Sequence, residues 1–403
     1  MRAPLDGVRV LDLTRILAGP LATQILSDLG ADVIKVERPG RGDDTRAWGP
    51  PFIRDRMRQV TSDSTYFACC NRGKKSVTLD LSKPEGQRLI RELAKQSDVL
   101  VENFKVGDLG RHGLGYSDLI RVNPQLIYCS ITGFGQTGPY RSRMGYDPVA
   151  QAMGALMSVT GEAERPPQRA GVAVVDVLTA TYAVIAIQAA LRHRDATGEG
   201  QHVDLALMDV QVSSMINIAQ AYLCEGEVAQ RNGGEHPSVV PSQSFRGADG
   251  YMMLAAANDF QFARLCEAVG LPELGADSRF KTNSDRVQHR VALTAILQAQ
   301  FAQHPVRYWE AKLLEAGVPC GPVNDIGQVF DDPQVHHRGL SFEMEHASAG
   351  PLPLVASPLR LSASPVRYRL APPLLGQHTV EVLQSRLGLS ATEIAQLRMA
   401  GVI

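Results

Sequence analysis

The first forty residues contain the pattern that most constrains the fold, because two strands and a helix follow one another with almost no connecting chain. VRVLDLT at 8–14 alternates apolar and polar residues, and GPLATQILSDLG at 19–30 has helical spacing with Pro20 near its start. ADVIKVE at 31–37 has the pattern of a second strand. Short strands separated by helices are typical of open α/β domains, so this segment predicts a largely parallel sheet.

The same alternation continues over the first half of the chain. Strand patterns occur at 76–81, 98–104, 126–134 and 201–208, and helical patterns at 84–96 and 178–194. We therefore expect residues 1–208 to form a large Rossmann-like domain around an open parallel sheet.

The pattern changes after a predicted helix near 209–227. The segment 232–245 is loop-like, 249–258 has the pattern of a hairpin strand, 259–316 is rich in helical spacing, and 316–325 is a Gly/Pro loop. These features predict a smaller α+β domain at about 225–330. The segment 345–403, with helices at 379–400, is predicted to pack back on the large domain, which then combines N-terminal and C-terminal parts of the chain.

Composition excludes several classes of partner. The 403 residues include 41 Lys and Arg against 42 Asp and Glu, a net charge of −1, so nothing indicates nucleic acid or an anionic membrane surface as a partner. The apolar stretches at 172–175 and 182–191 look too short or too interrupted to span a bilayer. The beginning of the chain lacks the apolar core of a secretory signal, so we expect a cytoplasmic protein.

The cysteines and histidines indicate neither disulfides nor metal. None of the six cysteines forms a CxxC pair, which favours reduced thiols in a cytosolic enzyme. No HExxH motif or Cys/His cluster is present, so no metal site is predicted.

The turn after the first strand bears on the ligand. TRILAGP at 14–20 contains only Gly19, whereas a dinucleotide-binding turn has GxGxxG, so a nicotinamide dehydrogenase is disfavoured. Arg38 follows the second strand, where such folds meet the ribose end of a nucleotide, and NRGKKS adds Arg72, Lys74 and Lys75. These residues either bind a phosphate or are ordinary solvated cations. A neutral protein with local basic clusters suits a small phosphorylated ligand.

Nine strings occur in an order that identifies a family. The chain resembles the class III CoA-transferases, of the formyl-CoA transferase and carnitine CoA-transferase type, from Leu5 to Ile403. Each string alone is weak, but the ordered set is specific: LDLTRILAGPLATQILSDLGADVIKVERP, NRGKKS, DVLVENF, SITGFGQTGP, GYD, VVDVLTATYA, TGEGQHVD, GVPCGPV and PPLLGQHT. The resemblance implies a CoA thioester as substrate, no tightly bound cofactor, a CoA-binding role for residues 1–208, and an interlocked homodimer of ring-shaped chains.

Asp176, at the end of AGVAVVD, matches the family's catalytic aspartate. From its position alone, the favoured interpretation is that Asp176 is the N-cap of the following helix. The resemblance implies that Asp176 attacks the thioester carbonyl to give a mixed anhydride, and that CoA thiolate converts this into an aspartyl-CoA thioester. Water must be excluded from such intermediates. The oxyanion donors are expected either near Gly133–Gly138 or at the start of the helix over 178–194.

Other site residues are carried over from the resemblance. Ile16, Leu17 and Ala18 match the segment that lines the CoA and acyl site. The positions that hold the nucleotide and pantetheine are Arg38, Lys75, Asn103, Phe104 and Arg111, although Asn103 and Phe104 would also fit an ordinary strand end.

Tyr146 and Asp147 match a pair that lies near the catalytic carboxylate. The related α-methylacyl-CoA racemases have histidine at the position of Tyr146, and an imidazole paired with an acid suits proton abstraction. A tyrosine hydroxyl, with an ordinary pKa of about 10, does not, which disfavours the alternative of a racemase-like enzyme. A non-catalytic CoA-binding protein is the other alternative, and the presence of Asp176 with Tyr146–Asp147 argues against it.

The acyl acceptor is expected to be a dicarboxylate. The glycine-rich loop of formyl-CoA transferases is absent around 254–262, and Leu17 stands where they have glutamine. The segments 42–52 and 238–245 most resemble the succinyl-CoA:dicarboxylate branch, typified by glutarate and itaconate CoA-transferases. Candidates for binding the second carboxylate are Arg46, Arg72, His236 and Ser242.

Overall fold

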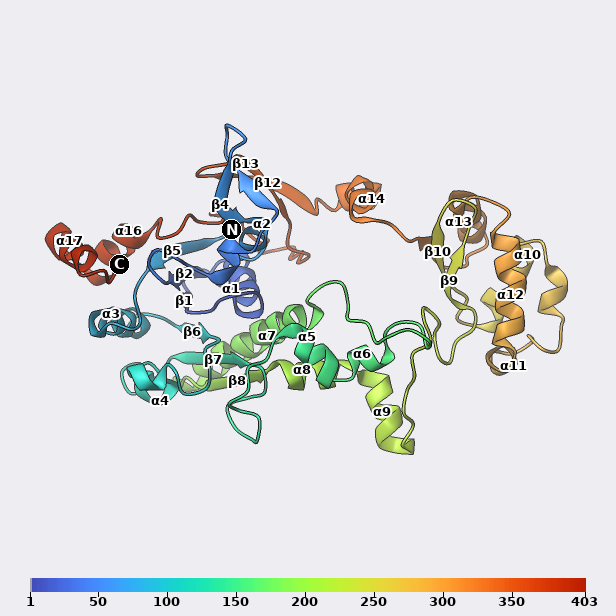
Figure 1. Cartoon of the computed structure of the whole chain (residues 1–403), viewed down its shortest axis with the longest axis horizontal. Helices are drawn as coiled ribbons and strands as arrows, with labels where there is room; N and C mark the ends of the chain where they lie inside the picture. The colour runs from blue at the N-terminus through green and yellow to red at the C-terminus, as the bar shows by residue number, and fades with distance from the viewer. Residues whose placement is uncertain (1) are drawn as a thin grey trace. The chain divides into compact units, whose positions relative to one another are not determined.

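The computed structural model describes residues 2–403 and divides the chain into two compact units (Figure 1). The larger unit contains the described residues up to Ala155, then Ala170–Ala219 and His336–Ile403. The smaller unit contains Leu156–Arg169 and Gln220–Val335. The larger unit is thus assembled from both ends of the chain.

A six-stranded sheet forms the centre of the larger unit, in the order β5-β2-β1-β6-β7-β8. Every neighbouring pair is parallel, which confirms the predicted parallel sheet. Counted along the chain, this is the doubly wound order 3-2-1-4-5-6, in which ligands bind where the order reverses, here between β1 and β6. The strands are β1 Arg9–Asp12, β2 Asp32–Glu37, β5 Lys74–Thr78, β6 Val99–Glu102, β7 Ile127–Thr132 and β8 His202–Ala206.

Helices cover both faces of this sheet, because successive strand residues point to opposite sides and both sides are apolar. Val10, Val33 and Val101 face α1 (Ala18–Asp28) and α7 (Val174–Thr197). Leu11, Ile34 and Leu100 face the core that contains α3 (Pro84–Lys95), α16 (Thr379–Leu387) and α17 (Ala391–Met399). The C-terminal helices therefore complete one layer of the domain.

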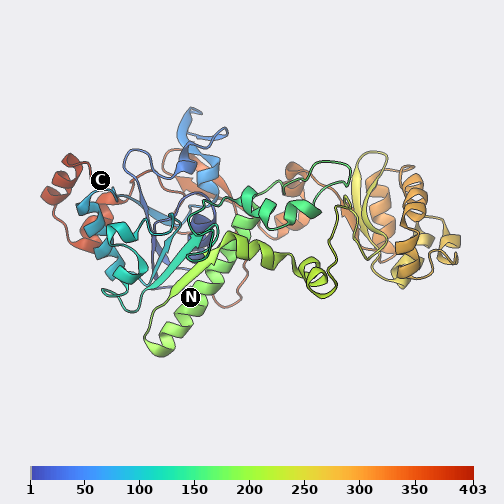
Figure 2. The ribbon, with the colours of Figure 1, turned by 60° about the horizontal axis from the view of Figure 1, so that its bottom comes forward.

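Helix α7 is longer and more apolar than the sequence suggested. It has 24 residues and, by length and composition, could cross a membrane. The expectation that the apolar stretches here are too short is therefore wrong for this helix. It does not by itself indicate a membrane span, because a core helix has the same composition. Ala180, Ala183 and Ile187 are buried in the core shared with α1, and Figure 2 shows α7 lying along the sheet.

The remaining elements of the larger unit are two antiparallel hairpins and several short helices. The hairpins pair β3 (Phe52–Arg54) with β4 (Val60–Ser64) and β12 (Ser341–His346) with β13 (Gly350–Val355). The helices are η1 Asp44–Ala47, α2 Thr65–Cys69, η2 Gly110–His112, α4 Tyr116–Leu119, α5 Asp147–Met153 and α8 Leu207–Ser214; α9 Ile216–Glu225 and α15 Pro333–His337 span the unit boundaries. The helix expected near 209–227 is divided between α8 and α9, where Ile216 has φ 36°.

The smaller unit packs helices on a three-stranded antiparallel sheet, ordered β11-β10-β9. Phe245, Phe301 and Trp309 are buried in its core. Residues 232–245 were expected to be a loop, but the last four of them belong to β9, because a tight turn with Gly247 N–H donating to Gly250 O pairs β9 with β10. The elements are α6 Leu156–Val159, β9 Ser242–Arg246, β10 Tyr251–Ala255, α10 Asp259–Ala268, η3 Pro272–Gly275, α11 Asn283–Gln288, α12 Arg290–Phe301, α13 Val306–Glu315, β11 Cys320–Pro322 and α14 Ile326–Asp331.

Candidate active site

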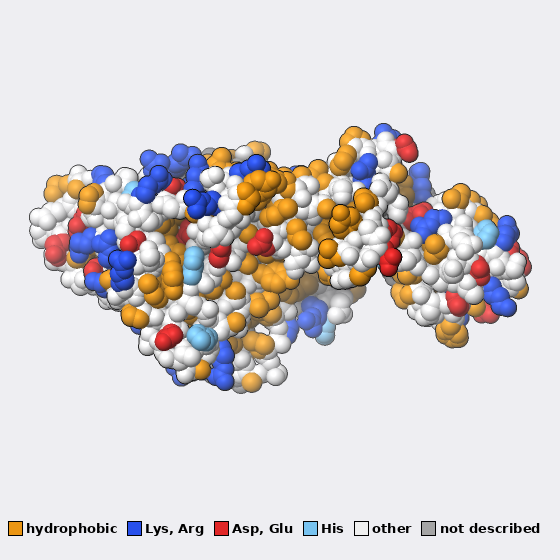
Figure 3. Space-filling model, turned by 90° about the horizontal axis from the view of Figure 1, so that it is seen from below, with side chains coloured by type: hydrophobic (Ala, Val, Ile, Leu, Met, Phe, Trp, Pro, Cys, Tyr) orange, Lys and Arg blue, Asp and Glu red, His pale blue; other side chains and the backbone are white. Residues whose placement is uncertain are grey.

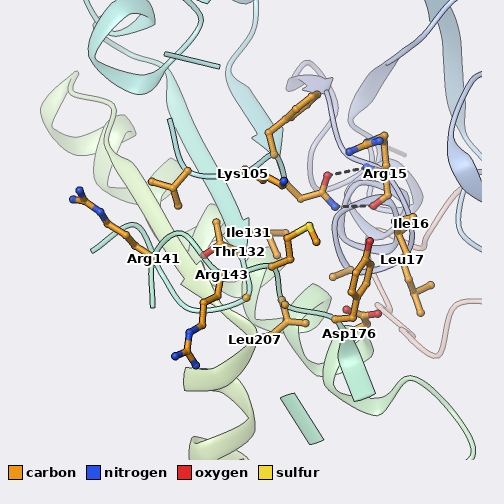
Figure 4. A pocket seen from close by; sticks show the side chains of 18 of the residues that line it. Arg15, Ile16, Leu17, Lys105, Ile131, Thr132, Arg141, Arg143, Asp176 and Leu207 are labelled. Atoms are coloured by element: carbon orange, nitrogen blue, oxygen red, sulfur yellow. Dashed lines mark hydrogen bonds between the residues drawn. The ribbon is translucent and has the colours of Figure 1, made fainter. Parts of the chain in front are cut away.

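A pocket of about 170 Å³ opens at the carboxyl edge of the sheet, where β1 and β6 are neighbours (Figure 4). Its walls come from the turn after β1, the loop after β6, the end of β7, the segment 141–146 and the start of α7. Asp176 is the only acidic residue among those that line it. The lining residues are Arg15–Ala18, Asn103–Val106, Ile131–Gly133, Arg141–Tyr146, Asp176 and Leu207.

Asp176 lies in the first turn of α7, whose N-cap is Ala173 and has no side-chain cap. The interpretation of Asp176 as the N-cap is therefore wrong. The buried carboxylate of Asp147 caps the helix instead. Its Oδ2 accepts the N–H of Val175 at 2.8 Å and that of Asp176 at 3.3 Å.

A short network holds this capping carboxylate. Asp147 is 4% exposed, and its Oδ1 accepts a 2.6 Å hydrogen bond from Gln151 Nε2. Gln151 Oε1 in turn accepts the N–H of Ala170 at 2.8 Å. Helix α5 and the start of α7 are thus joined through side chains directly behind Asp176.

The environment of Asp176 makes its carboxylate unusually basic. Burial raises its pKa to about 7, and the negative charge of Asp147 contributes in the same direction. The pKa of Tyr66 is raised to about 12, mainly by burial and partly by the charge of Asp176. A carboxyl group with such a pKa in a pocket is a candidate nucleophile or general base.

The turn after β1 forms the wall that contains Ile16, Leu17 and Ala18. Asn103 Oδ1 accepts the N–H of Arg15 at 2.9 Å, and its Nδ2 donates to Arg15 O at 2.7 Å, as the dashed lines of Figure 4 show. The Asn103 amide, which was expected to bind CoA, is thus occupied by protein backbone. Phe104 lines this pocket and a second one.

The second pocket, of about 430 Å³, lies over the carboxyl ends of β1, β2 and β5. Arg38 lines it, as do Arg15 and Phe104, which it shares with the first pocket. The two pockets are therefore adjacent along the edge of the sheet. Arg111 is exposed and pairs with Asp108, a residue of the second pocket.

Three predicted basic residues lie outside both pockets. Lys75 pairs with Glu381 at 3.0 Å and with Asp32 at 4.0 Å. Arg46 is buried, pairing with both carboxylate oxygens of Glu37 at 2.8 Å and with Asp63 at 2.7 Å. Arg72 is also buried and pairs with Asp28. Both guanidinium groups are thus neutralised inside the protein, and their predicted role in binding a substrate carboxylate stays a prediction.

His236 and Ser242 belong to the smaller unit. There His236 N–H donates to Ser242 O at 2.9 Å, and His236 Nδ1 accepts the N–H of Ser238 at 3.2 Å. Their predicted role with a substrate carboxylate stays a prediction.

Sequence reasoning missed four cationic residues that line the first pocket: Arg15, Lys105, Arg141 and Arg143. Figure 4 shows Arg141 and Arg143 on the side of the pocket opposite Arg15, Ile16 and Leu17. Arg15 pairs with Asp44 at 2.9 Å. Across residues 2–403, no carboxylate forms an ion pair with Arg141 or Arg143. The only signal in the sequence was the position of these two arginines just before Tyr146–Asp147.

Comparison with known proteins agrees with this arrangement. The family model described as CoA-transferase family III matches residues 5–379. Succinyl-CoA:glutarate CoA-transferase of Mus musculus is 46% identical over 400 residues, covering 99% of this chain and 90% of that protein. Succinate–glutarate CoA-transferase of Agrobacterium fabrum is 46% identical, covering 95% of each chain.

Solved structures show the same relationship. The crystal structure of a CAIB/BAIF family protein from Brucella suis superposes with a TM-score of 0.86 at 46% identity, covering 96% of this chain and 100% of that one. The residues matched by the family model, 5–379, include parts of both units and the residues that line the pocket. The chain belongs to CoA-transferase family III and is a CoA-transferase.

Proposed function

We propose that this CoA-transferase moves CoA from succinyl-CoA to a small dicarboxylate such as glutarate or itaconate, with Asp176 as the nucleophile. The observation that carries the proposal is a single carboxylate, Asp176, in a pocket lined by four cationic side chains at the switch point of the sheet. Its pKa of about 7 leaves an appreciable ionised fraction at neutral pH while making that fraction more nucleophilic than an ordinary carboxylate.

The reaction needs no energy input, because a thioester is exchanged for a thioester. Ionised Asp176 attacks the carbonyl of succinyl-CoA, which forms a mixed anhydride and releases CoA thiolate. The thiolate attacks the aspartyl carbonyl, so that succinate leaves and an aspartyl-CoA thioester remains. The acceptor carboxylate then attacks this thioester, and CoA thiolate attacks the acceptor side of the new anhydride, which restores Asp176.

The two adjacent pockets suggest how the thioester lies. The nucleotide occupies the second pocket, where Arg38 binds a CoA phosphate, and the pantetheine passes Arg15 and Phe104 into the first pocket. Asp147 holds the start of α7, so that the Asp176 carboxylate meets the thioester carbonyl in a fixed position.

A dicarboxylate fits the distribution of charge in the first pocket. Asp176 lies on one side of the pocket and the exposed Arg141 and Arg143 on the other, with their guanidinium groups pointing outward in Figure 4. An acid lying across the pocket presents one carboxylate to the nucleophile and the second to one of these guanidinium groups, which turns inward to bind it. Relatives named for glutarate, at 46% identity, support the same class of acceptor.

The interlocked homodimer and a cytoplasmic location are parts of the same proposal. Apolar side chains are exposed on α7 and α8, namely Val177, Tyr182, Ile185 and Val212, and Figure 3 shows exposed hydrophobic side chains on the face seen from below. A second chain would cover such surface. The six free thiols suit a reducing compartment.

The direct test is an exchange assay with succinyl-CoA and a panel of acids, in which acyl-CoA products are identified by mass spectrometry. We expect glutaryl-CoA or itaconyl-CoA to form at least about 100-fold faster than butyryl-CoA in kcat/KM, because a monocarboxylate leaves the arginines unpaired. Asp176→Asn should abolish transfer. Asp209→Asn, an exposed acid in the first turn of neighbouring α8, is the matched control and should retain it. Equal rates with butyrate would refute the dicarboxylate assignment.

A further inference from the structure

The turn between β1 and α1 contains an unfavourable backbone conformation. Ile16 has φ 74°, in the left-handed region, where a β-branched residue is a clear outlier. Ile16 also lines the pocket that contains Asp176. Such a conformation persists only when the surrounding structure enforces it, and it is most often found at functional sites.

Side chains from several elements hold this turn. Thr14 N–H donates to Asp12 Oδ1 at 2.9 Å, and Thr14 O accepts from Lys35 Nζ at 2.7 Å. Asn103 Oδ1 accepts the N–H of Arg15 at 2.9 Å, and Asn103 Nδ2 donates to Arg15 O at 2.7 Å. Ile16 N–H donates to Asp43 Oδ1 at 3.2 Å. Five consecutive backbone polar groups therefore have a side-chain partner.

Two of these partners, Lys35 and Asp43, are buried and paired within the protein. They are at most 1% exposed and pair with each other at 3.0 Å. Asp43 also accepts from the N–H and hydroxyl of Thr45, at 3.0 and 2.8 Å. Asn103 follows β6 and bonds to Arg15, which follows β1. It therefore links the ends of the two strands that flank the switch point.

We propose that Asn103 and Asp43 are positioning residues for the transfer reaction, which hold Ile16 in its left-handed conformation. The turn brings Leu17, Ala18 and the start of α1 into the pocket wall on the same side as Asp176. The first turn of α1 has no side-chain cap, so the positive end of its dipole is available to the negative charge that develops on the thioester oxygen. The inference rests on the proposed function of Asp176. It assigns Asn103 a role through the turn rather than through contact with CoA.

A double-mutant cycle tests the proposal. Asn103→Ala removes both bonds to Arg15, and we expect kcat to fall about 30-fold with the KM for succinyl-CoA changed less than about 3-fold. Ile16→Gly makes the left-handed conformation intrinsically accessible. Asn103→Ala should therefore cost no more than about 5-fold in the Ile16→Gly background. An equal loss in both backgrounds, or a loss confined to KM, would overturn the proposal and indicate direct contact between Asn103 and CoA.

Asn123→Ala is the matched control, because Asn123 Nδ2 also donates to two backbone carbonyls, those of Ala94 and Ser97, outside both pockets. It should lower thermal stability and leave kcat unchanged. Hydrogen exchange of the amides of residues 14–17 gives a readout independent of activity, and Asn103→Ala should accelerate it at least tenfold while Asn123→Ala does not. Unchanged hydrogen exchange at residues 14–17 in Asn103→Ala would contradict the proposal that Asn103 holds this turn. If the exchange rates change as expected but the wild-type protein transfers no CoA, the proposed function is contradicted, and the role of Asn103 in holding the turn is not.

Discussion

The carboxylate of Asp147 accepts the backbone N–H of Asp176 at 3.3 Å while its negative charge helps to raise the pKa of the Asp176 carboxyl. One buried residue thus fixes the position of the nucleophile and increases its basicity. Position and basicity can be separated experimentally, because asparagine retains an acceptor oxygen and removes the charge.

Activity should rise with pH through the pKa of Asp176. The pKa is about 7, and only the ionised carboxylate attacks, so kcat/KM should increase about tenfold from pH 6 to pH 8. In Asp147→Asn, the midpoint should move to lower pH by about 0.5–1 unit, because the repulsive charge is gone. The measurement is the pH profile at constant ionic strength. A flat profile for the wild type, or a midpoint moved upward in Asp147→Asn, would contradict this account.

The basic carboxylate should also reduce stability at neutral and alkaline pH. The pKa of Asp176 is about 7 in the folded state and has the ordinary value of 3.8 in the unfolded chain, so folding favours the protonated form. This unfavourable contribution is absent below pH 4 and grows until pH exceeds about 7. Asp176→Asn should therefore raise the free energy of unfolding by about 1–3 kcal/mol at pH 8, after allowance for partial exposure.

Denaturant unfolding at pH 4 and pH 8 checks this prediction. The stabilisation by Asp176→Asn should be seen at pH 8 and nearly disappear at pH 4. Asp209→Asn should change little at either pH, because Asp209 is exposed. A destabilised Asp176→Asn variant at pH 8 would show that the native carboxylate is stabilised by its surroundings rather than strained.

Arg141 and Arg143 should determine the preference for dicarboxylates. Replacing either by alanine removes a cation from the side of the pocket opposite Arg15. We expect kcat/KM for glutarate to fall about 10–100-fold for at least one of the two variants, while kcat/KM for butyrate changes less than about 3-fold. Arg192→Ala, an exposed arginine of α7 outside both pockets, is the control. Equal losses of kcat/KM for glutarate and butyrate would indicate that these arginines contact CoA and not the acceptor acid.

Arg38 should act on binding of CoA and not on the chemical steps. Arg38→Ala is expected to raise the KM for succinyl-CoA about tenfold with little change in kcat, because a remote phosphate contact stabilises ground state and transition state equally. The 3′-dephospho analogue of succinyl-CoA provides the complementary test. If Arg38 binds the 3′-phosphate, the analogue and the substitution should each weaken binding, and their combination should add little further loss. Additive losses would mean that Arg38 contacts another part of CoA.

Much of the fold could be predicted, because the spacing of hydrophobic residues and the positions of turn residues can be seen within a short stretch of sequence. The strands at 31–37 and 126–134 and the helix at 84–96 occur within a few residues of their predicted bounds. The hairpins β3–β4 and β12–β13 were missed. β12 alternates regularly but has only six residues, and its partner β13 contains two prolines, which usually argue against a strand.

The electrostatics of the site could not be predicted, because they depend on contacts distant in the sequence. Arg72 and Arg38 look alike as isolated arginines, yet Arg72 pairs with Asp28, 44 residues away, and Arg38 lines a pocket. Likewise, nothing in LTRILAG indicates that Ile16 adopts a positive φ, since the Asn103 and Asp43 side chains that hold the turn come from later segments.

The central claim is that CoA becomes covalently attached to Asp176, and mass spectrometry of the protein quenched in acid after incubation with succinyl-CoA tests it most directly. We predict that wild type and Asp209→Asn carry one CoA in thioester linkage, located at Asp176 in the peptide from the start of α7, and that glutarate removes it. Asp176→Asn should carry none. An adduct that persists in Asp176→Asn, or that is located on another residue while the enzyme turns over, would contradict the account.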